Sequence, residues 1–131
     1  MDNTNEQSTT FLPIWIWIIA LLHVILVLFF SAGTFMDPAS FIPGATELDY
    51  ATQLYITRNV TVALAITVAL LFKSYKALFI LLLIRVVTDI SDVITVYVFN
   101  VEVIKESVPM VVVLLIIPAL VALGYLWKRI K

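Results

Sequence analysis

The sequence predicts an all-α integral membrane protein, built as an antiparallel four-helix bundle that runs up, down, up and down. Of its 131 residues, 63% are hydrophobic and 13% are charged, whereas soluble domains are about 45–50% apolar and about 25% charged. The apolar residues fall into four runs, each close to the ~20 residues that cross a bilayer. Short connections make consecutive helices antiparallel neighbours. We therefore expect four spans in one domain.

The expected organisation has three parts. Residues 1–12 form a polar N-terminal tail, residues 13–128 form the transmembrane domain, and residues 129–131 form a basic C-terminal end. The spans are expected at about 13–33, 48–72, 77–99 and 108–127. The first is expected to be a retained helix, because no Lys or Arg precedes it and it exceeds the ~7–15 apolar residues of a cleaved signal peptide.

Local signals mark where the helices begin. Pro13 suits the first helical position, because its missing N–H costs nothing there. Thr46 with Asp49 three residues later is expected to form a capping box before the second span. Ser107 is the expected N-cap of the fourth span. Within that span, Pro118 is expected to bend the helix and to free a backbone carbonyl.

Basic residues predict the orientation. One side of the bundle receives five of them, and the opposite side receives only Lys105 among several acids. The five are Lys73, Lys76, Lys128, Arg129 and Lys131. By the positive-inside rule, both termini are expected to be cytoplasmic. Aromatic residues near the span ends are expected to form belts at the two interfaces.

Four charged residues lie within the spans: Arg58, Arg85, Asp89 and Asp92. Each charge at the centre of a membrane helix costs ~2.5–3.5 kcal/mol, so we expect these side chains to face the interior and to find partners. Arg85 and Asp89 are four residues apart on one helix face. A rise of ~1.5 Å per residue places Arg58 level with Asp92 on the neighbouring helix.

Two interpretations of this cluster remain open. It either lines a polar pocket that opens to the outer face, or it fixes the register of the helices. The candidate ligand-binding or polar-core residues are Tyr55, Arg58, Asn59, Arg85, Thr88, Asp89, Asp92 and His23. His23 is expected to be an interhelical histidine rather than a catalytic base. The connection at 37–50 is expected to pack on the outer rim, with a lid over the pocket as the alternative.

Several functions are disfavoured by composition. A net charge of −1 gives no basic field for nucleic acid. The absence of cysteine removes thiolate catalysis and iron–sulfur ligation, and one histidine is too few for a conventional metal site. No sequence motif specifies a reaction, so we expect no cofactor and favour a non-enzymatic role.

The segments Leu54-Tyr55-Ile56-Thr57-Arg58-Asn59 and Arg85-Val86-Val87-Thr88-Asp89-Ile90-Ser91-Asp92, joined by a short basic turn, resemble the small bacterial DoxX-like membrane proteins. The resemblance covers roughly residues 50–95. It implies a four-helix bundle in the bacterial inner membrane, and some members of the wider group are linked to quinone or sulfur redox chemistry. It would make Arg58, Asn59, Arg85, Asp89 and Asp92 a shared polar core, with no enzymatic role.

Three functional hypotheses follow. The first is that the bundle binds a small polar or amphipathic ligand, which the arginines hold by an anionic or carbonyl group. The second is an accessory subunit that docks on a membrane redox protein. The third, least favoured, is an enzyme that uses His23 and Asp89 as acid and base. The partners expected are therefore the lipid bilayer and either a small molecule or another membrane protein.

Overall fold

The computed structural model describes residues 12–131, and within that range the chain is helical apart from short connections. The expected tail at 1–12 lies almost wholly outside the described residues. Three helical stretches are long and apolar enough to cross a membrane. They are α1 (Ile14–Met36), α3 (Tyr50–Leu71) and Val108–Ile130, which comprises α6 (Val108–Val111), the π-helical turn η1 (Val112–Ile116) and α7 (Ile117–Ile130).

A fourth long helix, α4 (Tyr75–Val98), has 24 residues. It carries four charged residues, Lys76, Arg85, Asp89 and Asp92, which sets it apart from the other three in composition. Two single-turn helices, α2 (Pro38–Phe41) and α5 (Glu102–Lys105), lie in the connections. The sequence signals did not predict either of them.

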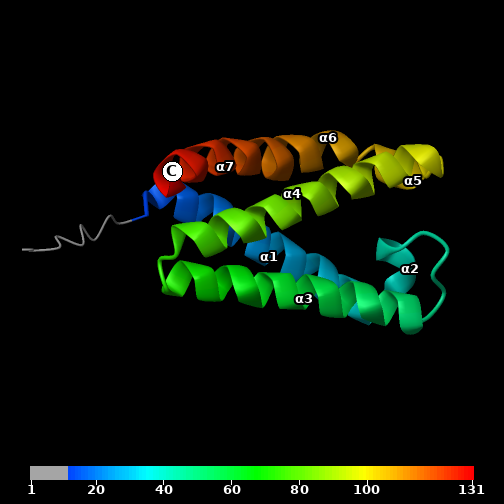
Figure 1. Cartoon of the computed structure of the whole chain (residues 1–131). Coiled ribbons are helices and arrows are strands. Elements are labelled where there is room, and N and C mark those ends of the chain that lie inside the picture. Colours follow the sequence, from blue (N-terminus) through cyan, green and yellow to red (C-terminus); the bar gives the residue numbers. More distant parts are fainter. Residues whose placement is uncertain (1–11) are drawn as a thin grey trace, which may run out of the picture.

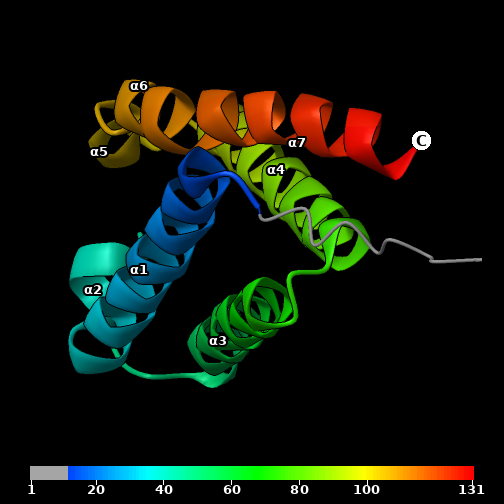
Figure 2. The same cartoon turned by 90° about the vertical axis from the view of Figure 1, so that its left-hand side faces the viewer.

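The long helices are arranged as a ring. α1 packs against α3 and α7, and α4 packs against α3 and α7. Figure 1 shows the start of α1, the α3–α4 connection and the end of α7 at one end of the molecule, with α2 and α5 at the other. Figure 2 shows α7 lying across the top, with α1 and α4 running down from it and α3 at the bottom.

The apolar core lies in the half nearer the α3–α4 connection. Ile16, Ile66, Leu78, Leu82 and Leu126 are all fully buried there. Small residues at the contacts, Ala20, Ala63, Ala119 and Ala122, are also buried, and small side chains allow helix backbones to approach closely. These residues form an apolar core that joins the four long helices at this end.

The outward faces of all four long helices are apolar. Ile25 in α1, Leu64 in α3, Val87 in α4 and Val113 in η1 are each more than half exposed. Soluble monomers rarely expose contiguous apolar patches larger than a few hundred Å². Acyl chains are as apolar as these side chains, so a bilayer accommodates them.

The second long helix starts at a different cap from the one expected. The Asp49 carboxylate accepts a hydrogen bond from the Thr52 N–H at 2.8 Å, and the Thr52 hydroxyl lies 2.8 Å from the Asp49 N–H. This is a capping box with Asp49 as N-cap, so the prediction that Thr46 forms the box with Asp49 is wrong. The Thr52 N–H lowers the pKa of the Asp49 carboxyl.

The last helical stretch departs from the expectation at two points. Ser107 precedes α6, but its side chain makes no capping hydrogen bond. The irregularity expected at Pro118 takes the form of the wide turn η1, which directly precedes that proline. Pro118 has no N–H to donate to the preceding turn, and a π-helical turn is a known local adjustment where the regular ladder is broken.

The α1–α3 connection is fixed to α1 through one aromatic side chain. The Phe41 ring lies 6.1 Å from the Phe30 ring and 6.3 Å from the Phe29 ring, both edge-on. It also covers Gly33, where an added Cβ would lie 2.2 Å from the Phe41 ring. The absence of a side chain at Gly33 is therefore what lets α2 dock.

Substitution Gly33→Ala is expected to push the Phe41 ring off α1. Overpacking costs typically ~1–3 kcal/mol, so α2 should loosen while the long helices remain. Hydrogen exchange should be faster at residues 38–45 than in the parent. The matched control is Gly124→Ala in α7, where an added Cβ meets nothing within 4 Å; it should stabilise the protein by about 0.5–1 kcal/mol. Unchanged exchange at 38–45 in Gly33→Ala would contradict the docking.

Candidate functional site

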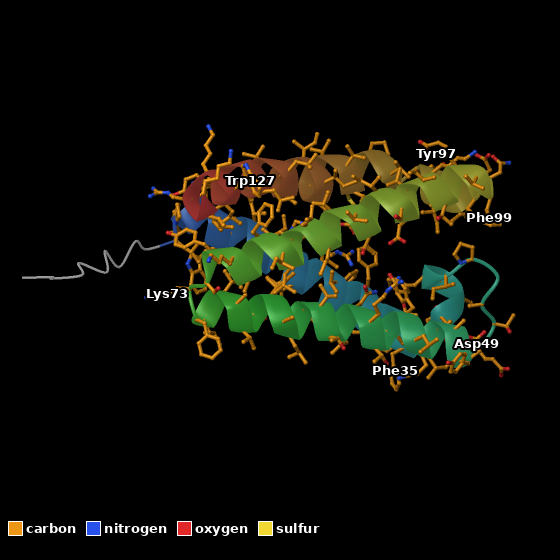
Figure 3. All side chains as sticks on the ribbon, in the orientation of Figure 1. Phe35, Asp49, Lys73, Tyr97, Phe99 and Trp127 are labelled. Carbon is orange, nitrogen blue, oxygen red and sulfur yellow. The ribbon has the colours of Figure 1, made fainter. Side chains whose placement is uncertain are left out.

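A cavity of about 980 Å³ lies between the helices in the half away from the α3–α4 connection. Residues from α1, the α2 segment, α3, α4, α5, α6 and η1 form its wall. Figure 3 shows Asp49, Tyr97 and Phe99 at this end of the molecule and Lys73 and Trp127 at the other. The charged residues on the wall are Asp49, Arg58, Arg85, Asp89 and Asp92.

Arg85 forms the buried centre of this wall. One end of its guanidinium pairs with the Asp89 carboxylate at 2.5 Å, and Nη1 donates to the Asn59 side-chain oxygen at 3.3 Å. Asp89 is 3% exposed and Asn59 is 4% exposed. Arg85 thus links α3 to α4, and its charge is balanced within its own helix. The pairing across one helical turn follows from the i,i+4 spacing.

The pair is incompletely satisfied. Nε of Arg85 and Oδ2 of Asp89 are buried, and neither has a hydrogen-bond partner among residues 12–131. Buried polar atoms are rarely left without a partner, and both side chains face the cavity. The buried ion pair beside the cavity therefore leaves one donor and one acceptor without a partner among residues 12–131.

Arg58 and Asp92 also line this cavity, but they differ from Arg85 and Asp89 in their exposure and in their pairing. Both are exposed, and within the described part of the chain neither makes a hydrogen bond or an ion pair. They interact electrostatically with each other from facing helices, in agreement with the level placement expected from helix rise. The expected pairing of all four charges is nevertheless wrong, because only Arg85 and Asp89 form an ion pair.

The other candidate residues are divided between the wall and its surroundings. Tyr55 lies on the wall, close to the Asn59 side chain. Asn59 itself stands behind the wall, where it holds Arg85. Thr88 is not on the wall. Its hydroxyl donates to the Ile84 carbonyl of its own helix at 2.9 Å.

His23 is fully buried in α1 and is not part of the cavity wall. Its Nδ1 lies 2.9 Å from the Ile19 carbonyl, which places the proton on Nδ1. Nε2 has no hydrogen-bond partner within the described residues, and its neighbour is the backbone of Leu115 in η1. The histidine thus packs between α1 and the π-helical turn, behind the lining residue Leu115.

The sequence analysis missed much of the wall. Ser40, Phe41 and Pro43 from the α1–α3 connection contribute to it, so this segment both packs on α1 and borders the cavity. Asp49 was considered only as a helix cap. The apolar lining residues include Phe29, Phe30, Val93, Val96, Val111 and Leu115. The unusual length of the 37–50 connection could have indicated that it borders the cavity. The apolar lining residues gave no such indication, because they lie in spans that are apolar throughout.

Comparison with known proteins adds no assignment: no family model, no curated protein and no solved structure matches the chain.

Substitution Arg85→Leu is expected to leave Asp89 buried without its cation. Breaking a buried ion pair from one side costs ~3–5 kcal/mol, whereas replacing both partners by apolar residues is often neutral. The single variant should therefore unfold at clearly lower denaturant than the double variant Arg85→Leu/Asp89→Leu, followed by circular dichroism during SDS titration of micelles. Thr88→Val, one turn away, should stay close to the parent. Equal stability of the single and double variants would show that the pair is not coupled.

Proposed function

We propose that this chain is a four-span membrane protein that binds a small amphipathic ligand in the cavity between its helices. Helix α4 is long enough to span the membrane, but it carries Arg85, Asp89 and Asp92. Its three neighbours of spanning length and the apolar outward face of α4 itself support a fourth crossing. All three charged residues border the internal cavity, so the crossing does not require them to face lipid.

The orientation proposed for the antiparallel bundle places the Lys73 end in the cytoplasm. Around that end, Arg129 lies over the Tyr125 ring at 5.3 Å and donates to its hydroxyl at 3.1 Å, and Lys131 lies over Trp127 at 5.5 Å. Basic and aromatic residues together are typical of a cytoplasmic interface. The cavity is then on the opposite, outer half of the membrane.

One observation carries the ligand proposal: a cavity large enough for a small molecule combines a mostly apolar wall with a few convergent charged groups. Binding sites for small molecules have this composition. Arg58, which is exposed on the wall, supplies a charged donor for an anionic or carbonyl group. Asp89 holds Arg85, the other arginine of the wall, in an ion pair.

The alternatives are less well supported by this geometry. An accessory subunit without a ligand of its own is expected to have a closed and fully paired core, whereas this core contains the cavity and unpaired atoms. An enzyme using His23 with Asp89 requires both at the substrate, and His23 lies off the wall.

The orientation is testable because the sequence has no cysteine. Single cysteines placed at Lys73 and at Glu106 should react with a membrane-impermeant maleimide from opposite sides of the membrane. In intact cells or right-side-out vesicles, only the Glu106→Cys variant should be labelled, and Lys73→Cys should need permeabilisation. Labelling of both variants in intact cells would contradict the single membrane crossing by α4 that is proposed between these sites.

The ligand is testable by filling the cavity. Val93→Trp adds bulk to the wall, whereas Val87→Trp adds the same bulk to the outward face of the same helix. Lipids and metabolites that co-purify with the parent should be depleted at least severalfold in Val93→Trp and retained in Val87→Trp, as measured by mass spectrometry of solvent extracts. Arg85→Ala should also alter the profile. Identical profiles in all four proteins would refute the pocket.

A further inference from the structure

We infer that the ligand is a zwitterionic amphiphile, with its anionic group at Arg58 and its ammonium group at Asp92. This inference rests on the proposed ligand-binding function and specifies the ligand's chemistry. It follows from the state of each charged residue on the cavity wall, from the balance of charge in the cavity and from the apolar remainder of the wall.

Three of the five charged residues on the wall already have partners. Arg85 and Asp89 pair with each other at 2.5 Å. The Asp49 carboxylate accepts the Thr52 N–H at the N-terminus of α3, where the helix dipole also favours a negative charge. Arg58 and Asp92 are left, one positive and one negative, without an ion pair or hydrogen bond among residues 12–131.

These two residues face one another across the cavity. Arg58 belongs to α3 and Asp92 to α4, both border the cavity, and each is exposed. Asp92 interacts electrostatically with Arg85 and, less strongly, with Arg58, and it forms an ion pair with neither of them among residues 12–131. In a low-dielectric surrounding, a counter-charge brought close to a charged group lowers the electrostatic free energy of that group strongly. A single molecule that carries both signs can satisfy both residues at once.

The balance of charge disfavours ligands of one sign. The wall carries two arginines and three aspartates, so a plain anion would add to an existing excess of negative charge. A plain cation would satisfy Asp92 but leave Arg58 without a partner. A headgroup with an ammonium and an anionic group adds no net charge, and both of its groups meet an opposite one.

The rest of the wall selects an amphiphile. Phe29 and Phe30 from α1, Val96 from α4 and Leu115 from η1 line the cavity. Buried apolar surface contributes roughly 25 cal/mol per Å², so an acyl chain binds here more favourably than a headgroup alone. The same headgroup chemistry occurs in phosphatidylethanolamine and in soluble phosphoethanolamine, and binding strength distinguishes the two sources.

Native mass spectrometry of the detergent-purified protein tests the inference. Phosphatidylethanolamine should bind at least about tenfold more tightly than phosphatidylglycerol with the same acyl chains. The difference corresponds to one hydrogen bond to a charged group, which only the ammonium-bearing lipid makes with Asp92. Soluble phosphoethanolamine should bind more weakly than either lipid. Arg58→Gln and Asp92→Asn should each weaken phosphatidylethanolamine binding about tenfold or more. Lys105→Gln and Glu106→Gln, at the same end but off the wall, should not.

The two variants should differ in their response to the anionic lipid. Asp92→Asn removes a repelling charge, so phosphatidylglycerol should bind it more tightly than it binds the parent, and a misfolded variant cannot produce this gain. Arg58→Gln should weaken both lipids. Equal affinity of the parent for the two lipids, or no gain for phosphatidylglycerol in Asp92→Asn, would overturn the zwitterion assignment while leaving ligand binding intact. No retained lipid in any protein would refute the proposed function itself.

Discussion

The structure depends on a charge placed where charges are costly: the Arg85 guanidinium, held by Asp89 in its own helix and by Asn59 in the next. α4 carries enough charge to fall outside the composition of its apolar neighbours. The salt bridge and the hydrogen bond let this helix pack with the others. They also fix α3 against α4 at one depth, because Asn59 and Arg85 meet at only one register.

This arrangement divides the molecule into two functional halves. Towards the α3–α4 connection, alanines and large aliphatic residues close the core completely, as the buried Ala122, Leu78 and Leu126 show. Beyond Arg85 the helices enclose the cavity instead. On the cavity wall, the ion pair and the hydrogen bond from Asn59 fix Arg85 and Asp89. In the proposed binding site, such preorganisation of the wall would lower the cost of binding.

Hydropathy and helical spacing predict a large part of this structure. The apolar runs gave three helices of spanning length near the expected positions, and the i,i+4 spacing gave the Arg85–Asp89 pair. Local signals were less decisive. Thr46 and Asp49 both precede the second long helix with suitable cap chemistry, and the choice of Asp49 depends on its exchange of hydrogen bonds with Thr52. The turn η1 depends on how the chain relaxes before Pro118, which residue types do not specify.

The contrast between Arg58 and Arg85 shows where sequence reasoning ends and why the cavity matters. The two residues have the same side chain and lie on neighbouring helices, and both were expected to face the interior and to find partners. Arg85 has an aspartate one turn away and an asparagine opposite, so it is buried and balanced. Arg58 has no acidic residue within a turn of its own helix, and its counter-charge, Asp92, lies across the cavity on α4. Sequence spacing determines the first case. The second depends on the separation of two helices, which residue spacing along one chain segment does not specify. It leaves Arg58 and Asp92 as exposed charges on the wall of one cavity.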